Sequence, residues 1–149
     1  MNDYICGCDY LNGDGTMSKL SIVIFSGTGD KLLSAGVLSQ AAAAMGTEVE
    51  VFVTFWGLLS FTKGEKKMIM PKEFEAMGPA LMEGMKREHV KSWYEMLKEA
   101  KEFGAKIYAC SMAAGVMNIK REDLDPIVDD MVGAAKFLAD AEGGQMLFI

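Results

Sequence analysis

Histidine is almost absent from this sequence, and cysteine is scarce. The single histidine, His89, excludes a histidine-dependent catalytic triad and any metal site built from several histidines. Three cysteines among 149 residues are too few, and odd in number, for a scaffold held together by disulfides. The sequence therefore favours an intracellular protein without a disulfide framework.

Positive charge and long apolar runs are lacking as well. Lysine and arginine number 15 against 21 aspartates and glutamates, so the net charge is −6, which disfavours binding along nucleic-acid phosphates. The longest apolar stretch, residues 49–61, is interrupted and falls short of the roughly 20 residues that span a bilayer. Residues 1–16 lack the basic and apolar stretches of a signal peptide, so we expect a cytoplasmic protein with no membrane span.

The sequence is rich in apolar residues. Half of the residues are hydrophobic, enough for a sizeable core, and the length fits one domain. Residues 1–17 are rich in Asn, Asp and Gly and show no hydrophobic period. We therefore expect a flexible N-terminal tail over 1–17 and one α/β domain over 18–149. Thirteen methionines are an excess that needs an explanation.

From residue 20 onward, short apolar runs alternate with helical patterns. Strands are predicted over residues 20–25, 48–54, 105–111 and 145–149. Helices are predicted over residues 31–45, 88–103, 112–118 and 133–142, and glycines mark the ends of three of them. Residues 127–131 fit either a strand or the start of a helix. This alternation predicts a layered α/β domain with a mostly parallel sheet of about five strands.

The first predicted helix, residues 31–45, is apolar almost all round. Such a helix needs cover on more than one side, and a subunit interface would supply the second cover. Residues 73–85 also carry apolar side chains at helical spacing, but Gly78 and Pro79 interrupt them.

Ligands of open parallel sheets bind beyond the carboxyl ends of the strands. Three predicted loops meet this rule, at residues 27–30, 54–57 and 110–113. Cys110 ends a predicted strand and precedes a helix, where backbone N–H groups and the helix dipole favour a thiolate. Free cysteine is also among the most buried residue types, so a purely structural Cys110 fits its position equally well.

Other candidate sites are weaker. Residues 27–30 (GTGD) lack the phosphate-loop pattern, and a simple strand-to-helix turn with Asp30 as N-cap is favoured. Cys6 and Cys8 form no complete zinc site, and we interpret them as incidental. His89 is expected in the solvated first turn of its helix. Five acidic residues between positions 122 and 130 are expected on solvated faces. They are Glu122, Asp123, Asp125, Asp129 and Asp130.

Five methionines gather in the middle of the chain, interrupted by glycine and proline. They are Met68, Met70, Met77, Met82 and Met85. Methionine fills irregular gaps and builds adaptable surfaces. We favour a mobile lid or an oligomer contact beside the candidate site over a gap-filling core.

Residues 51–58 (VFVTFWGL), 108–112 (YACSM) and 146–149 (MLFI) together resemble the DsrE/DsrF-like sulfur-relay family, in its DsrE-like branch, sometimes labelled peroxiredoxin-family. The resemblance runs from about residue 20 to 149. It implies a flavodoxin-like three-layer α/β sandwich, homo-oligomers that are often trimers or hexamers, and sulfur trafficking between proteins. The sulfur-carrying cysteine of the family corresponds to Cys110. No family role extends to Cys6 or Cys8.

The resulting hypothesis is a sulfur-relay protein or sulfurtransferase that carries a persulfide on Cys110. Thiolate attack on a sulfane sulfur needs no metal and no organic cofactor, and its partners would be sulfur-donor and sulfur-acceptor proteins. The expected surroundings are the turn of Ser111, Met112 and Ala113, the walls Thr54 and Trp56, and Gly27 of the first loop.

Two other functions remain open at this level. The first is a non-catalytic oligomeric interaction module that docks partners through its Met-rich face. The second, which we favour less, is a flavin or nucleotide binder, because nothing in residues 27–30 is specific for such a ligand.

Overall fold

The computed structural model of the chain describes residues 18–149, so the expected tail with Cys6 and Cys8 lies outside the described residues. Within 18–149, all five strands form one parallel sheet in the order β4-β3-β2-β1-β5. Their bounds are β1 (Lys19–Ile24), β2 (Glu48–Val53), β3 (Lys106–Cys110), β4 (Asp130–Val132) and β5 (Gln145–Phe148). The predicted α/β class and strand number are confirmed, and the sheet is entirely parallel.

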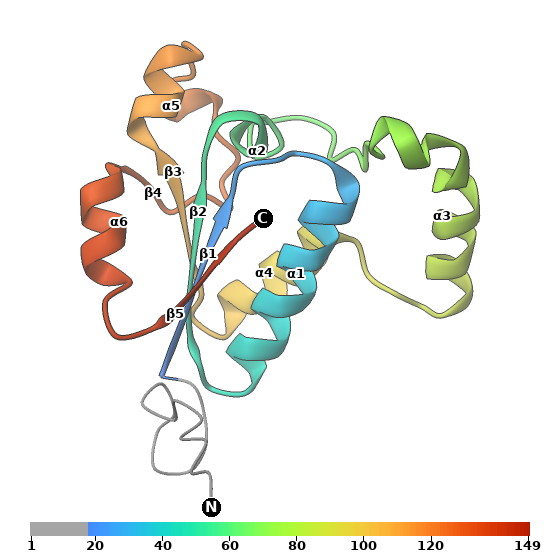
Figure 1. Cartoon of the computed structure of the whole chain (residues 1–149), viewed down its shortest axis with the longest axis horizontal. Coiled ribbons are helices and arrows are strands. Elements are labelled where there is room, and N and C mark those ends of the chain that lie inside the picture. Colours follow the sequence, from blue (N-terminus) through green and yellow to red (C-terminus); the bar gives the residue numbers. More distant parts are fainter. Residues whose placement is uncertain (1–17) are drawn as a thin grey trace, which may run out of the picture.

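Helices lie on both faces of this sheet and make three layers (Figure 1). On one side are α1 (Gly29–Ala44) and α4 (Trp93–Glu102), and on the other is α6 (Ala134–Asp140). Two short helices, α2 (Phe55–Leu59) and α5 (Ser111–Val116), follow β2 and β3 at the carboxyl edge. A single turn of 3-10 helix, η3 (Arg121–Asp123), precedes β4.

The core follows from the alternation of side chains along the strands. Ile22, Val51 and Ile107 point to one face and are buried at 0–1% exposure. Leu32 of α1 and Leu97 of α4, both fully buried, complete that layer. Burying each such side chain stabilises the fold by about 1.5–3 kcal/mol. On the opposite face, Phe137 of α6 stacks on Phe52 of β2 with ring centroids 4.7 Å apart.

Helix α1 begins two residues earlier than predicted, and the expected cap is wrong. Thr28, in an extended conformation, occupies the N-cap position, and Asp30 lies inside the first turn. Threonine and aspartate are both favourable N-cap residues, so the local sequence does not predict which of the two caps the helix. The predicted end is confirmed, because Gly46 adopts φ +83° just after the helix. Val37 and Leu38 of α1 are about 40–45% exposed.

Helix α4 begins five residues later than predicted. Ser92 is its N-cap, accepting from the Glu95 N–H while its own N–H donates to the Glu95 carboxylate, so this capping box fixes the start. His89 precedes it with φ +54°, a left-handed conformation that separates the two helices. Val90, also in the connection before α4, is 42% exposed. His89 is exposed, but in this connection and not in a helix.

The Met-rich segment forms an arm that stands away from the body (Figure 1). The arm consists of a 3-10 helix, η2 (Lys72–Met77), followed directly by α3 (Gly78–Arg87). Gly78 and Pro79, predicted to interrupt a helix, instead begin one, since a proline in the first turn lacks only an N–H that has no helical partner. Of the arm residues, only Gly78 is buried.

Candidate functional site

Cys110 is the last residue of β3 and the N-cap of α5, as the sequence predicts. Its Sγ accepts a hydrogen bond from the Ala113 N–H at 3.5 Å. Parallel pairing places Val132 of β4 beside it. Cys110 is 3% exposed, so it combines a buried position with a backbone donor directed at its sulfur.

The turn after Cys110 is exposed on one side and buried on the other. Ser111 and Met112 are exposed, Met112 by 58%, whereas Ala113 is fully buried. Helix α5 has only six residues, and Met117 closes it by donating to the Ala113 carbonyl at 3.0 Å. The segment over the thiol is therefore short and held by few helical hydrogen bonds.

Thr54 and Trp56 belong to the neighbouring strand end. Thr54 is buried, and its N–H donates to the carbonyl of Ile24 in β1 at 3.0 Å. It is the N-cap of α2, which packs against β3 and α5. Trp56, two residues further, is 58% exposed. The elements that carry Thr54 and Cys110 are thus in contact at the carboxyl edge.

Gly27 lies with Trp56 beside a separate pocket of about 250 Å³, which we call the Gly27 pocket. A Cβ on Gly27 would lie 2.7 Å from the Trp56 carbonyl oxygen, so only glycine permits this approach. The other lining residues are Leu59, Ser60, Thr62, Lys63, Glu65, Lys67, Ile69 and Trp93. Cys110 and Thr54 are not among them. The structure therefore divides the expected site residues between the Cys110 turn and this pocket, with α2 between them.

The backbone at the start of α1 already has a partner. The Gly29 N–H donates to the Ile69 carbonyl at 2.6 Å. A Cβ on Gly29 would lie 2.3 Å from Cγ of Met68, so the segment after α2 packs directly over this turn. Residues 27–30 thus form a covered strand-to-helix turn, as favoured over a phosphate loop, although Thr28 rather than Asp30 is the cap.

Asp125 was expected on a solvated face, and that expectation is wrong. It is 6% exposed, with Lys66 Nζ at 2.9 Å and the Tyr94 hydroxyl donating to it at 2.8 Å. Burial alone would raise the pKa of Asp125, but hydrogen bonds from Lys66, the Ile127 N–H and Tyr94 outweigh it and lower the pKa. Burial, and then the bond to Asp125, raise the pKa of Tyr94 to about 12.

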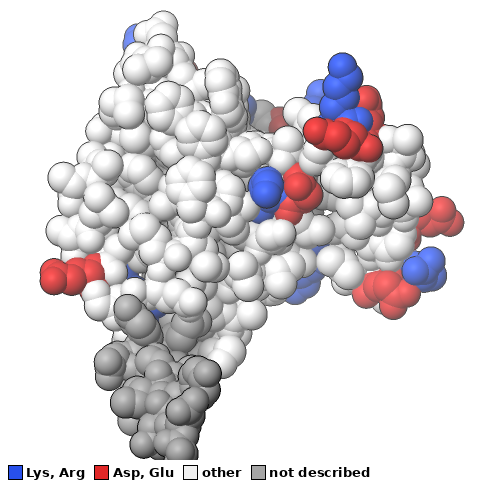
Figure 2. Space-filling view, in the orientation of Figure 1, with Lys and Arg blue, Asp and Glu red and all other residues white. Residues whose placement is uncertain are grey.

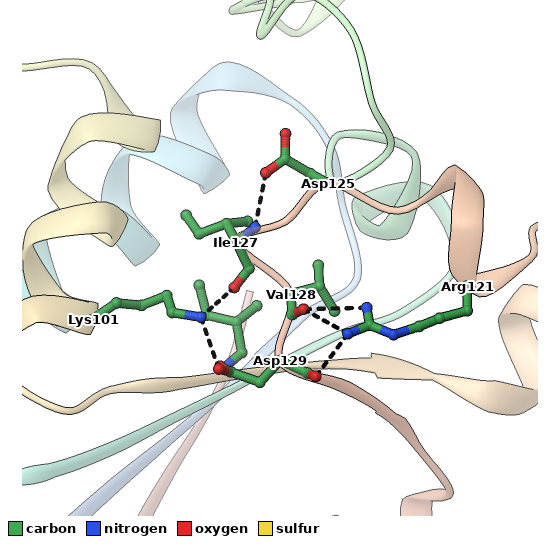
Figure 3. Close-up of polar contacts among 7 residues, drawn as sticks. Lys101, Arg121, Asp125, Ile127, Val128 and Asp129 are labelled. Atoms are coloured by element: carbon green, nitrogen blue, oxygen red, sulfur yellow. Dashed lines mark hydrogen bonds and ion pairs between the residues drawn. The ribbon is translucent and has the colours of Figure 1, made fainter.

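Asp129 is likewise paired and half-buried (Figure 3). Lys101 of α4 lies 2.8 Å from its carboxylate and also donates to the Ile127 carbonyl at 2.7 Å. Arg121 donates to the carbonyls of Val128 and Asp129. These bonds hold the segment that leads into β4, the strand beside Cys110. Local periodicity does not predict these bonds, because Lys101 comes from the distant α4 and Arg121 from the separate turn η3.

Two further searches of residues 18–149 concern metals and membranes. No group of three or more His, Cys, Asp or Glu side chains in this part of the chain is arranged to hold a metal ion. Among the described helices, none has both the length and the apolarity to cross a bilayer.

Comparison with known proteins extends over nearly the whole chain. Residues 16–84 and 62–149 match the sequence profile of the DsrE/DsrF/DrsH-like family. The protein YrkE of Bacillus subtilis is 34% identical over 156 residues, covering 88% of this chain and 96% of its own length. The sulfur carrier protein DsrE2 of Allochromatium vinosum is 33% identical over 144 residues, covering 80% and 89%.

Solved structures agree on the fold. The MTH1491 protein of Methanobacterium thermoautotrophicum has a TM-score of 0.57 at 13% identity, covering 88% of this chain and 98% of its own. The ychN protein of E. coli has a TM-score of 0.59 at 12% identity, covering 89% and 98%. The sequence matches and the parallel five-stranded fold point the same way: the chain belongs to the DsrE/DsrF/DrsH-like family.

Proposed function

We propose that the protein is a sulfur carrier that holds sulfane sulfur as a persulfide on Cys110 and passes it to a thiol of a partner protein. The family and the DsrE2 relative support a sulfur-relay role in general. The observation that carries the finer proposal is the place of Cys110 at a strand end, with the Ala113 N–H directed at its sulfur.

The chemistry balances without a cofactor. The Cys110 thiolate attacks the outer sulfur of a donor persulfide, a sulfur–sulfur bond forms, and the donor leaves as a thiolate. The acceptor thiolate then attacks the outer sulfur on Cys110, which regains its thiolate form. Each transfer exchanges one sulfur–sulfur bond for another, so no external oxidant or reductant is required.

The surroundings of Cys110 have separate roles in this proposal. The backbone N–H groups after Cys110, in the turn of Ser111, Met112 and Ala113, stabilise the sulfur anion. Since the thiol is buried, transfer requires a local opening of α5, whose six residues make few helical bonds. Thr54, at the end of the neighbouring strand, limits the site on the α2 side, whereas Trp56 lines the Gly27 pocket.

The proposal also includes a setting. The carrier works in the cytoplasm, where thiols stay reduced. It exchanges sulfur with donor and acceptor proteins, and it functions as a homo-oligomer, as the family resemblance implies.

Sulfur loading tests the proposal. The full chain is treated with inorganic polysulfide, desalted and weighed intact. We expect a gain of about 32 Da, one sulfur atom, that dithiothreitol removes. Cys110→Ala should lose this gain, whereas a variant with Ser at both Cys6 and Cys8 should keep it. The proposal fails if the wild type gains no sulfur, or if Cys110→Ala gains as much as the wild type.

A second candidate is a non-catalytic module that docks partners through its Met-rich face. It is favoured by the exposure of Met77 and Met82 on the arm, 63% and 43%. An unreactive Cys110, slow to alkylate at neutral pH and without a sulfur adduct, would decide for this candidate.

A further inference from the structure

The Gly27 pocket is a cavity for which the proposed sulfur chemistry has no use. It holds about 250 Å³, the volume of roughly eight water molecules at about 30 Å³ each. Cys110 does not line it, and α2 separates it from the Cys110 turn. The pocket lies beyond the carboxyl ends of β1 and β2, the edge at which parallel sheets bind ligands. It is therefore a candidate binding site of its own.

The walls of the Gly27 pocket are apolar and largely aromatic. Both tryptophans of the chain line it. Trp93 is fully buried, whereas Trp56 is 58% exposed and stands beside the exposed side chains of Leu59 and Ile69. Three large apolar side chains thus leave surface in water around one hollow. A flat apolar ligand would remove that surface from water.

Two hydrogen-bond donors of the pocket are unused. The Ser60 hydroxyl lies directly over the backbone of Gly27, since a Cβ on Gly27 would be 2.8 Å from Ser60 Oγ. Among residues 18–149, neither the Ser60 hydroxyl nor the Gly27 N–H has a hydrogen-bond partner. Thr62 also lines the pocket, but its hydroxyl already donates to the Leu59 carbonyl at 2.8 Å. Ser60 and Gly27 can therefore donate together to one acceptor.

The charged residues of the lining carry one net positive charge. They are Lys63, Glu65 and Lys67. Glu65 and Lys67 lie 3.6 Å apart and offset each other, whereas Lys63 has no ion pair within the described part of the chain. Lys66 does not line the pocket and binds Asp125 instead. The lining therefore favours a ligand with one negative charge.

This positive lining is not a general property of the protein surface. The chain as a whole has a net charge of −6. In the space-filling view, most charged side chains lie on or beside the arm, and the body surface carries few (Figure 2). A net positive pocket on such a protein indicates selection for an anion.

We propose that the Gly27 pocket binds a small organic monoanion with a flat apolar body, of the aromatic carboxylate class. The apolar body lies against Trp56 and Ile69. The carboxylate accepts from the Ser60 hydroxyl and the Gly27 N–H, and Lys63 supplies the counter-charge. This proposal concerns binding alone and does not depend on sulfur transfer at Cys110.

Isothermal titration calorimetry of the full chain with 2-naphthoate tests the proposal. Two probes of the same shape accompany it, the neutral 2-naphthamide and the cationic 2-naphthylmethylammonium. We expect one 2-naphthoate per chain, bound at least about tenfold more tightly than either other probe, because hydrogen bonds to a charged acceptor are the stronger ones. Absence of 2-naphthoate binding, or equal affinities for the three probes, overturns the proposal.

Two exposed lysines test the origin of the charge preference. Lys63→Gln should weaken 2-naphthoate binding about threefold to tenfold and leave 2-naphthamide binding unchanged. Lys98→Gln is the matched control, because Lys98 is also exposed but lies over the Tyr94 ring and does not line the Gly27 pocket. It should leave the affinities of both probes unchanged. Equal losses for the two variants would contradict the role given to Lys63.

Trp56→Ala tests where the probes bind. Trp56 is exposed, so its removal should leave the fold intact, which the far-ultraviolet circular dichroism of the variant verifies. We expect the variant to bind all three probes more weakly, because the apolar wall is lost whatever the charge of the probe. An unchanged affinity for 2-naphthoate would place the bound probe on another surface, and the proposal would be wrong.

Discussion

Asp125 shows how much a single carboxylate contributes to the edge of this sheet. It binds Lys66 and Tyr94 through its side chain, and its own N–H donates to the Phe61 carbonyl at 2.8 Å. The three partners come from the segment after α2 and from α4. Asp125 therefore connects the segment leading into β4 to two elements that flank the Gly27 pocket, the segment after α2 and helix α4.

Asp125→Asn is expected to destabilise the protein by about 2–4 kcal/mol at pH 7, because it leaves Lys66 without its buried counter-charge. The pKa of Asp125 is lowered in the folded state, so its carboxylate stabilises the fold above the unfolded value of about 3.9. That contribution is lost as the pH falls through the folded pKa. Urea unfolding at several pH values should show wild type and variant converging in acid.

Glu122→Gln is the matched control for this prediction. Glu122 and its partner Lys120 are both more than two-thirds exposed, with a separation of 3.9 Å. The change should alter stability by no more than about 0.5 kcal/mol at any pH. Equal losses for Glu122→Gln and Asp125→Asn would contradict the role given to Asp125.

Among the elements, α2 lies directly against the end of β1. The Gly57 N–H donates to the Phe25 carbonyl at 2.7 Å. A Cβ on Gly57 would lie 2.5 Å from the carbonyl oxygen of Ile24, which is backbone and cannot move aside. This contact holds α2, and with it Thr54 and Trp56, at the carboxyl end of β1.

Gly57→Ala is expected to cost about 1–3 kcal/mol, because α2 must shift away from β1. Gly115→Ala makes the same chemical change in the neighbouring α5, where nothing lies within 4 Å of the added carbon. It should be neutral or stabilising by up to about 1 kcal/mol, since alanine favours helix. Thermal unfolding of both variants checks the opposite signs, and a loss at Gly115 as large as at Gly57 would refute the packing argument.

For the whole molecule, the sheet topology sets which parts open first. Strands β1, β2 and β3 each have neighbours on both sides, whereas β4 and β5 are short strands at the edges. Amide hydrogen exchange in β1, β2 and β3 should therefore be the slowest in the domain, with β4 and β5 clearly faster. Exchange of β5 as slow as that of β1 would show that another surface covers this edge.

The sequence by itself determined the class of fold and the order of its elements. Runs such as 20–25 and 48–54 are apolar at every or every second position, and that local pattern suffices to predict strands. Cys110 was placed at a strand end for the same reason. Gly46, which follows the end of α1, was also predictable from the sequence, because the positive φ at that position is a local requirement.

Only the tertiary structure decided the rest. Whether Thr28 or Asp30 caps α1, and whether Asp125 is solvated or paired, depends on residues far away in the chain. Tertiary packing also separated Gly27 from the Cys110 turn and left the arm apart from the body. Periodicity records which face of an element is apolar, but not what covers that face, because the partner lies elsewhere in the chain or in a second copy.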